Sequence, residues 1–134
     1  MRTQTSLLFF TSLLAPALGN FHIGRIIDCG GKWDAIACPS NEYNCDCFAN
    51  GKSAALTPGN PGSDSYFQVK AGLCGMGALS FYKDGNNYKF YVANGNGNQI
   101  GTCYPNSAAT VGCSTTFGAE NYVDGYVCYS SVCN

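Results

Sequence analysis

The chain has 134 residues, of which 13% are aromatic and only 11% are charged, with seven Lys and Arg against eight Asp and Glu. This length accommodates one domain and is too short for two domains with separate cores. The few charges are interspersed, and no basic stripe is present. Binding to nucleic acid or to an anionic membrane requires such a stripe, so we expect neither kind of partner.

The N-terminal segment, residues 1–19, has the three parts of a secretory signal peptide. Arg2 gives a short positive region, residues 7–15 form an apolar run, and small residues occupy positions 17 and 19, which a signal peptidase reads. The apolar run is shorter than the ~20 residues of a membrane helix, and no later stretch reaches that length. We therefore expect cleavage after Gly19 and export of residues 20–134 as a single secreted, extracellular domain.

The expected mature domain is rich in cysteine, and export would place it in an oxidising space where disulfides persist. The nine cysteines all follow the signal segment: Cys29, Cys38, Cys45, Cys47, Cys74, Cys103, Cys113, Cys128 and Cys133. Because Cys45 and Cys47 are spaced C-x-C rather than C-x-x-C, we expect structural disulfides, with no metal and no cofactor. On an extended segment these two side chains would point to the same side and bridge to different neighbours.

An odd number of cysteines leaves at least one without a partner inside the chain. The sequence decides neither which cysteine is unpaired nor how the other eight are joined. The odd thiol is either free or shared with a second molecule, so a disulfide-linked homodimer is one of the expected states.

Short runs rich in aromatic and β-branched residues alternate with turn-forming Asn-Gly and Asp-Gly dipeptides, a pattern typical of β structure. In chain order, the candidate strands are residues 22–28, 78–83, 88–93, 99–104 and 126–131. Residues 57–62 hold two prolines and two glycines, so we expect a loop there.

The clearest element is a hairpin formed by residues 78–83 and 88–93, joined by an Asp-Gly turn. Period-two alternation directs five of its side chains toward the core: Leu79, Phe81, Tyr88, Phe90 and Val92. Tyr82, Lys89 and Tyr91 then point the opposite way.

Residues 63–73 are the segment that suggests a helix. The polar stretch at 63–65 offers a cap, and Phe67 and Ala71 would share one side of the helix. The same run also suits a strand, because its aromatic and β-branched residues favour extended structure. Together these elements predict a mostly β fold, a small disulfide-stapled sandwich or barrel-like domain, with one short helix near residues 63–73.

His22 is the only histidine of the chain and would be the third residue of the mature protein. A Ser-His-Asp hydrolase or a histidine-dependent ribonuclease would have to use it, and catalysis needs a held geometry that a chain terminus seldom provides. We therefore interpret His22 as a surface or strand-edge residue. No spacing among the acidic residues marks a glycosidase pair, so we predict no catalytic residue and no enzymatic activity.

The outward side chains of the hairpin form a candidate ligand-contact surface: Tyr82, Lys89 and Tyr91. A tyrosine has an apolar ring and a polar hydroxyl, and such a ring stacks on a sugar or anchors a protein partner. The alternative is structural. The rings would then cover a second sheet or pack beside disulfides, as a two-layer β domain requires.

The small residues at positions 17 and 19, the nine cysteines and the short strands rich in Tyr, Asn and Gly resemble the small secreted cysteine-rich proteins of filamentous fungi. Many proteins of that class are effectors that act on a plant host, and others are antifungal or killer toxins. The resemblance covers the layout of the whole chain and rests on no catalytic or binding motif. The chain differs from hydrophobins, which need adjacent cysteine pairs, and from the basic antifungal miniproteins, because its charge is slightly acidic.

We therefore expect a secreted, non-enzymatic, effector-like protein that binds a host or other extracellular protein and modulates host defence. An extracellular carbohydrate-binding module is the first alternative, because Tyr82 and Tyr91 could stack on a glycan. An antimicrobial or killer-type toxin is the second alternative. The acidic balance weakens it, since anionic microbial surfaces attract cations.

Overall fold

The computed structural model describes residues 19–49, 51–116 and 118–133, and the expected signal segment up to residue 18 lies outside them. Strands make up most of these residues: β1 (Gly19–Ile27), β2 (Trp33–Pro39), β3 (Ala54–Thr57), β4 (Tyr66–Val69), β5 (Leu79–Asp84), β6 (Asn87–Val92), β7 (Gln99–Pro105), β8 (Val111–Thr115) and β9 (Gly118–Cys133). The helical elements in this part of the chain are α1 (Cys45–Ala49) and two 3-10 turns, at Ser40–Glu42 and Leu73–Gly75.

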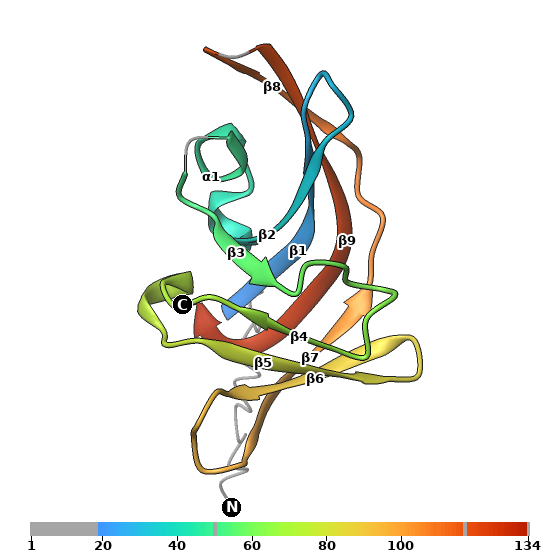
Figure 1. Cartoon of the computed structure of the whole chain (residues 1–134). Coiled ribbons are helices and arrows are strands. Elements are labelled where there is room, and N and C mark those ends of the chain that lie inside the picture. The colour runs from blue at the N-terminus through green and yellow to red at the C-terminus, as the bar shows by residue number, and fades with distance from the viewer. Residues whose placement is uncertain (1–18, 50, 117, 134) are drawn as a thin grey trace, which may run out of the picture.

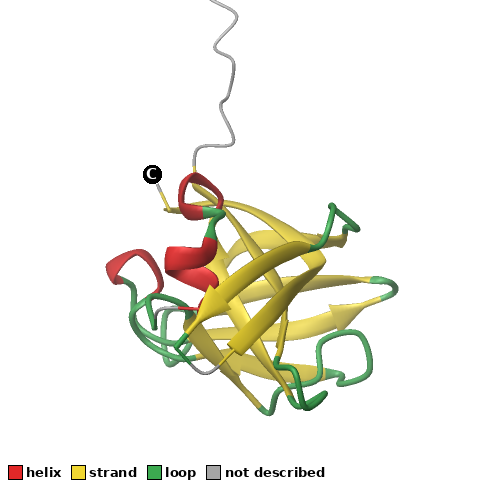
Figure 2. Cartoon of the chain, turned by 90° about the horizontal axis from the view of Figure 1, so that it is seen from above, coloured by secondary structure: helices red, strands yellow, loops and turns green. Residues whose placement is uncertain are grey.

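Eight of these strands close into an antiparallel barrel (Figure 2). Consecutive strands pair from β1 to β7, β7 pairs with β9, and β9 pairs with β1, which closes the ring. β8 lies outside the ring and pairs with the first part of β9 (Figure 1). The predicted mostly β, barrel-like fold is therefore confirmed.

The predicted hairpin is confirmed as β5 and β6, with Phe81 opposite Phe90 across it. The short helix predicted near residues 63–73 is wrong. Tyr66–Val69 form β4, a strand between β3 and β5, with Phe67 and Val69 buried on its inner side. Pairing on both edges overrides the weak helical preference of this segment.

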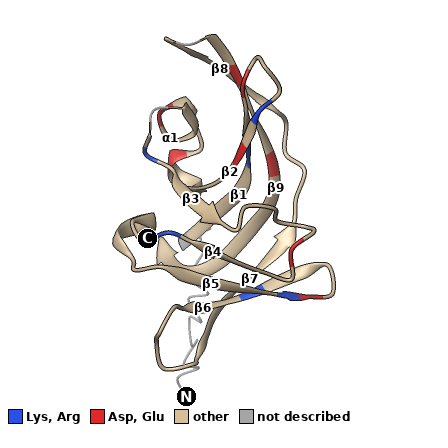
Figure 3. Cartoon of the chain, in the orientation of Figure 1, with Lys and Arg blue, Asp and Glu red and all other residues tan. Residues whose placement is uncertain are grey.

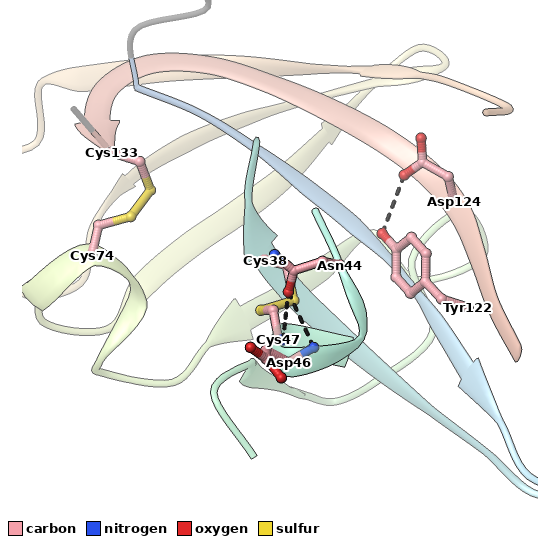
Figure 4. Close-up of a disulfide and its surroundings, with 8 residues drawn as sticks. All are labelled: Cys38, Asn44, Asp46, Cys47, Cys74, Tyr122, Asp124 and Cys133. Carbon is pink, nitrogen blue, oxygen red and sulfur yellow. Dashed lines mark hydrogen bonds between the residues drawn. A yellow bond between two sulfur atoms is a disulfide. The ribbon is translucent and has the colours of Figure 1, made fainter. Parts of the chain in front are cut away.

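The short α-helix lies earlier in the chain, at α1. Its start is capped by Asn44, whose Oδ1 accepts hydrogen bonds from the backbone N–H groups of Asp46 at 3.1 Å and Cys47 at 3.3 Å (Figure 4). An asparagine cap of this kind satisfies N–H groups that have no partner inside the first turn.

Aromatic side chains fill the barrel interior. Phe67 and Phe81 stack with ring centroids 4.7 Å apart, and Phe81 stacks on Phe90 at 4.8 Å. Phe90 lies directly against Gly101 of β7, where a Cβ would clash with its ring. Since the centre of the barrel is packed with rings, a ligand would have to bind on its outside.

A second apolar cluster lies outside the barrel, beneath α1. Its buried members are Ile36, Cys38, Cys47, Phe48, Cys113 and Tyr122. Phe48 of α1 stacks on Tyr122 of β9, with parallel rings 3.9 Å apart. The Tyr122 ring in turn lies over Gly24 of β1, where a Cβ would come within 2.5 Å of the tyrosine hydroxyl. Glycine is therefore required at this position for the ring to approach the strand.

A bulge in β9 divides its side chains between the two clusters. Across β1, Gly24 pairs with Asp124 and Ile23 pairs with Tyr126, so Gly125 is the extra residue. Asp124 consequently lies on the outer face beside the second cluster, whereas Tyr126 belongs to the barrel interior.

Candidate functional site

The three predicted contact residues lie on the outer face of the β5–β6 hairpin. Tyr82 pairs with Lys89 across the hairpin, and Tyr91 pairs with Ser80. β4 adds Tyr66, which pairs with Tyr82 from the other side. We name this surface the tyrosine face; its members are Tyr66, Gln68, Ser80, Tyr82, Lys89 and Tyr91.

The rings of the tyrosine face form a continuous row. The ring centroids of Tyr66 and Tyr82 are 5.1 Å apart, and those of Tyr82 and Tyr91 are 5.7 Å apart. Tyr82 is 49% exposed, so no second layer of the described chain covers it. The alternative in which these rings support a second sheet is therefore not what the fold shows.

Polar groups accompany this row of rings. The Ser80 hydroxyl accepts a hydrogen bond from Gln68 Nε2 at 3.2 Å and lies 3.5 Å from the Tyr66 hydroxyl. Ser80 is itself buried, so its hydroxyl is held in place at the base of the face. The surface thus combines apolar ring faces with fixed hydrogen-bonding groups.

A hollow of about 400 Å³ opens beside the rings. It is lined by Ser80, Tyr82 and Tyr91 and by the loop that follows β6. In this loop Asn94 has a left-handed φ of 58°, and the N–H of Gly95 donates to the carbonyl of Val92 at 3.0 Å. The volume falls in the range of small-molecule sites.

Lys89 lies on the tyrosine face but does not line the hollow. Its Nζ is 3.2 Å from Oδ2 of Asp84, and both side chains are about half exposed. Exposed ion pairs of this kind contribute little free energy, so a ligand could displace Asp84 from Lys89 at small cost. The structure therefore joins Tyr82 and Tyr91 in one site and leaves Lys89 at its margin.

The paired cysteines form four disulfides: Cys38–Cys47, Cys45–Cys113, Cys74–Cys133 and Cys103–Cys128. Figure 4 shows two of them, one beneath α1 and one at the end of β9. Cys45 and Cys47 do bridge to different neighbours, but from a helix and not from the extended segment that we expected. Cys29, in the turn between β1 and β2, is exposed and forms no disulfide.

A polar cluster centred on the buried Asp124 lies beside the second apolar cluster, and no sequence pattern predicted it. The carboxylate of Asp124 lies 3.1 Å from Nδ1 of His22 and accepts hydrogen bonds from the Tyr122 hydroxyl at 3.2 Å (Figure 4) and from the Asn106 amide. The Asp124 side chain is fully buried, and that of His22 is only 16% exposed. The interpretation of His22 as a surface or strand-edge residue is wrong, because β1 pairs with β2 on one edge and with β9 on the other.

The position of His22 on the outer face of its strand could have been predicted from the sequence. His22 stands between two apolar residues, Phe21 and Ile23, which in a strand places it on the opposite face from them. Its contact with Asp124 depends on the pairing of the first strand with the last, and strand pairing at such a distance leaves no pattern in a single sequence.

Tyr43 covers His22, with ring centroids 4.6 Å apart, and its buried hydroxyl has no hydrogen-bond partner within the described residues. Burial, followed by the charge of Asp124, raises the pKa of Tyr43 to about 12. The same two causes, in the same order, raise the pKa of Tyr122 well above its ordinary value. Both phenols therefore keep their protons through the neutral range.

These raised pKa values predict that the free energy of unfolding falls at alkaline pH. The unfolded chain releases the two protons from pH ~10 upward, before the folded chain does, so the stabilisation is complete below pH ~10. It is lost as the pH rises toward the folded pKa of Tyr43, about 12, with a slope approaching ~1.4 kcal/mol per pH unit for each tyrosine. Urea titrations at stepped pH measure this slope.

Two variants control the alkaline measurement. Tyr43→Phe should reduce the slope because it removes one of the buried phenols whose pKa is raised. Tyr82→Phe, which removes an exposed phenol outside the cluster, should keep the slope of the parent chain. Equal slopes for the parent and Tyr43→Phe would contradict the prediction.

In the part of the chain that the structure describes, no group of three or more His, Cys, Asp or Glu side chains could hold a metal ion. Nor is any helix in that part long and apolar enough to cross a membrane. Comparison of the chain with protein-family models, with curated proteins and with solved structures finds no match. The function has to be inferred from the side chains that the fold brings together.

Proposed function

We propose that the protein is a secreted, non-enzymatic binding protein that presents the tyrosine face to an extracellular partner. The observation that carries the proposal is the exposed row of Tyr66, Tyr82 and Tyr91 beside a hollow. Tyrosine supplies a large contact area and a hydrogen-bonding hydroxyl with few rotatable bonds, which is why it is enriched at binding sites.

The rigidity of the scaffold supports the same proposal. The strands that carry the face belong to a closed barrel, and four disulfides tie together the segments around them. A surface that is already ordered loses less conformational entropy when it binds. The layout shared with fungal secreted cysteine-rich proteins favours a host protein as the partner and an effector-like role in host defence.

A carbohydrate is the second candidate ligand, and the hollow favours it. A sugar ring offers C–H groups that pack on an aromatic face and hydroxyls that need hydrogen-bond partners. Tyr82 and Tyr91 supply the rings, and Ser80 and Asn94 supply polar groups in the same hollow. This candidate uses the same residues as the first, so the two differ in the partner and not in the site.

The test compares Tyr82→Ala and Tyr91→Ala with the parent chain in pull-downs from host extract and on chitin and glucan beads. We expect each variant to bind at least tenfold more weakly, as truncation of a central aromatic contact does. Tyr129→Ala is the matched control, because Tyr129 is 50% exposed on β9 and outside the tyrosine face. It should bind like the parent chain.

The outcomes separate the candidates. A saturable protein partner that Tyr82→Ala loses assigns the site to protein binding. Retention on chitin or glucan that Tyr82→Ala loses assigns it to a glycan. Binding that neither tyrosine variant weakens, or that Tyr129→Ala weakens equally, contradicts the proposal.

The unpaired ninth cysteine offers a second kind of partner, namely another copy of this chain. We propose Cys29, which is exposed, as the residue that joins two chains if the protein is a covalent homodimer. Non-reducing mass analysis should show four internal bridges, with Cys29 either as one free thiol or as the bond to a second copy. Cys29→Ser should remove both the thiol and the dimer. Labelling of any other cysteine in the native protein would contradict this assignment.

A further inference from the structure

The first half of β2 has a neighbour on one edge only. β1 pairs along the whole of β2, but β3 pairs only with Ile36 and Ala37. β3 then turns away to β4, where Leu56 pairs with Val69. Within the described residues, Trp33–Ala35 therefore have no partner strand on the side that faces β3.

This open edge lies in a groove of about 920 Å³ between α1 and the loop that follows β3. The groove is lined by apolar side chains that include Ile26, Ile36, Phe48 and Leu56. A free strand edge beside an apolar groove is the arrangement in which an extended peptide adds a strand. Its backbone then bonds to the edge, and its alternate side chains enter the groove.

The acidic side chains of the groove favour a peptide with positive side chains. Asp34, Asp64 and Glu120 line it, and neither Lys nor Arg is among its lining residues. In the described chain, none of these three carboxylates forms a salt bridge with a cation. Figure 3 shows acidic segments on β2 and on the first part of β9. An occupant with positive side chains would complement these charges.

Arg25 contacts a wall of the groove, and its position is fixed by other contacts. The Arg25 guanidinium lies 4.5 Å from the centre of the Trp33 ring and donates a hydrogen bond to Asn60 at 3.4 Å. Trp33 is 39% exposed, so its ring can form one wall for an incoming strand. Arg25 thereby holds the tryptophan in place and forms no salt bridge with any of the three carboxylates.

We propose that the open edge of β2 binds an extended peptide rich in lysine or arginine as an additional strand. This site uses strands other than those of the tyrosine face, so it goes beyond the proposed function and stands independently of it. The proposed ligand of this edge is a basic peptide segment of another protein.

The single tryptophan of the chain makes the test direct, because Trp33 lines the groove. The probe is a synthetic heptapeptide of alternating lysine and valine. We expect it to change the Trp33 fluorescence in a saturable manner and to slow hydrogen exchange of backbone amides in Trp33–Ala35. A glutamate–valine heptapeptide, and a lysine–valine heptapeptide with alternate amides methylated, should not bind.

Surface variants test the charge contribution. Asp34→Asn and Glu120→Gln should each weaken the peptide two- to fivefold, the range expected when one exposed ion pair is lost, and added salt should reduce the difference. Asp84→Asn is the matched control because that carboxylate pairs with Lys89 on the hairpin. It should leave the affinity unchanged.

Any of four results would overturn the proposal. The first is equal binding of the glutamate peptide, and the second is unchanged affinity in the Asp34→Asn, Glu120→Gln double variant. The third is unchanged exchange of the Trp33–Ala35 amides in the presence of the lysine peptide. Self-association of the chain that protects these amides without peptide would assign the edge to a second copy instead, and would also overturn it.

Discussion

Asp124→Ala is expected to lower the free energy of unfolding by about 3–5 kcal/mol. The substitution removes the acceptor shared by His22, Tyr122 and Asn106 and leaves these three donor groups without that acceptor. The Tyr122 hydroxyl is buried and would keep its full desolvation penalty, and the part-buried His22 and Asn106 groups would add smaller losses. Urea titrations at neutral pH measure the difference.

Two further variants separate charge from hydrogen bonding at this position. Asp124→Asn keeps the shape and one carbonyl oxygen, so it should lose less free energy than Asp124→Ala. Asp84→Ala removes an exposed carboxylate from the hairpin and should change stability little. A loss at Asp124→Ala no larger than that at Asp84→Ala would show that the cluster does not stabilise the fold.

Replacement of Cys45 and Cys113 with alanine is expected to lower the free energy of unfolding by about 4 kcal/mol. This bridge joins residues 68 positions apart and ties α1 to β8. Its removal allows the unfolded chain many more conformations, because the loop that it closes is long. It also loosens the apolar cluster that α1 covers.

The Cys38–Cys47 bridge is the internal control, since it closes a separation of only 9 residues. Its removal by the same alanine substitutions should lower the free energy of unfolding by about 2.5 kcal/mol on the chain-entropy account. Both variants are to be compared under identical non-reducing conditions, with Cys29 alkylated in each. A larger loss for the shorter loop would contradict the entropic explanation.

The features that sequence could predict are those set by local alternation. The inner residues of the hairpin, among them Phe81 and Phe90, and the outer residues Tyr82 and Tyr91 all lie on the faces that a period of two assigns to them. This succeeds because each strand of the hairpin has one face toward the core, and a shift of one residue would reverse every side chain.

The features that sequence could not predict depend on distant pairing. Residues 66–69 carry both helical and strand signals, and only their position between β3 and β5 decides the outcome. α1 has five residues, too few for a helical period to be visible. The Asp124 cluster needs the bulge at Gly125 and the contact of β9 with β1, which are set by the closure of the barrel.

The pairing of β1 with β9, which closes the barrel, also determines the order in which the correct disulfides can form. Three of the four disulfides use a cysteine in β8 or β9, and only Cys38–Cys47 is complete before those strands exist. Until β9 arrives, β1 and β7 are open edges, and the other thiols are free to form wrong bridges or to recruit another chain. The step that limits correct oxidative folding is therefore the pairing of a single sixteen-residue strand, β9. A disulfide isomerase would act mainly on bridges formed before this step.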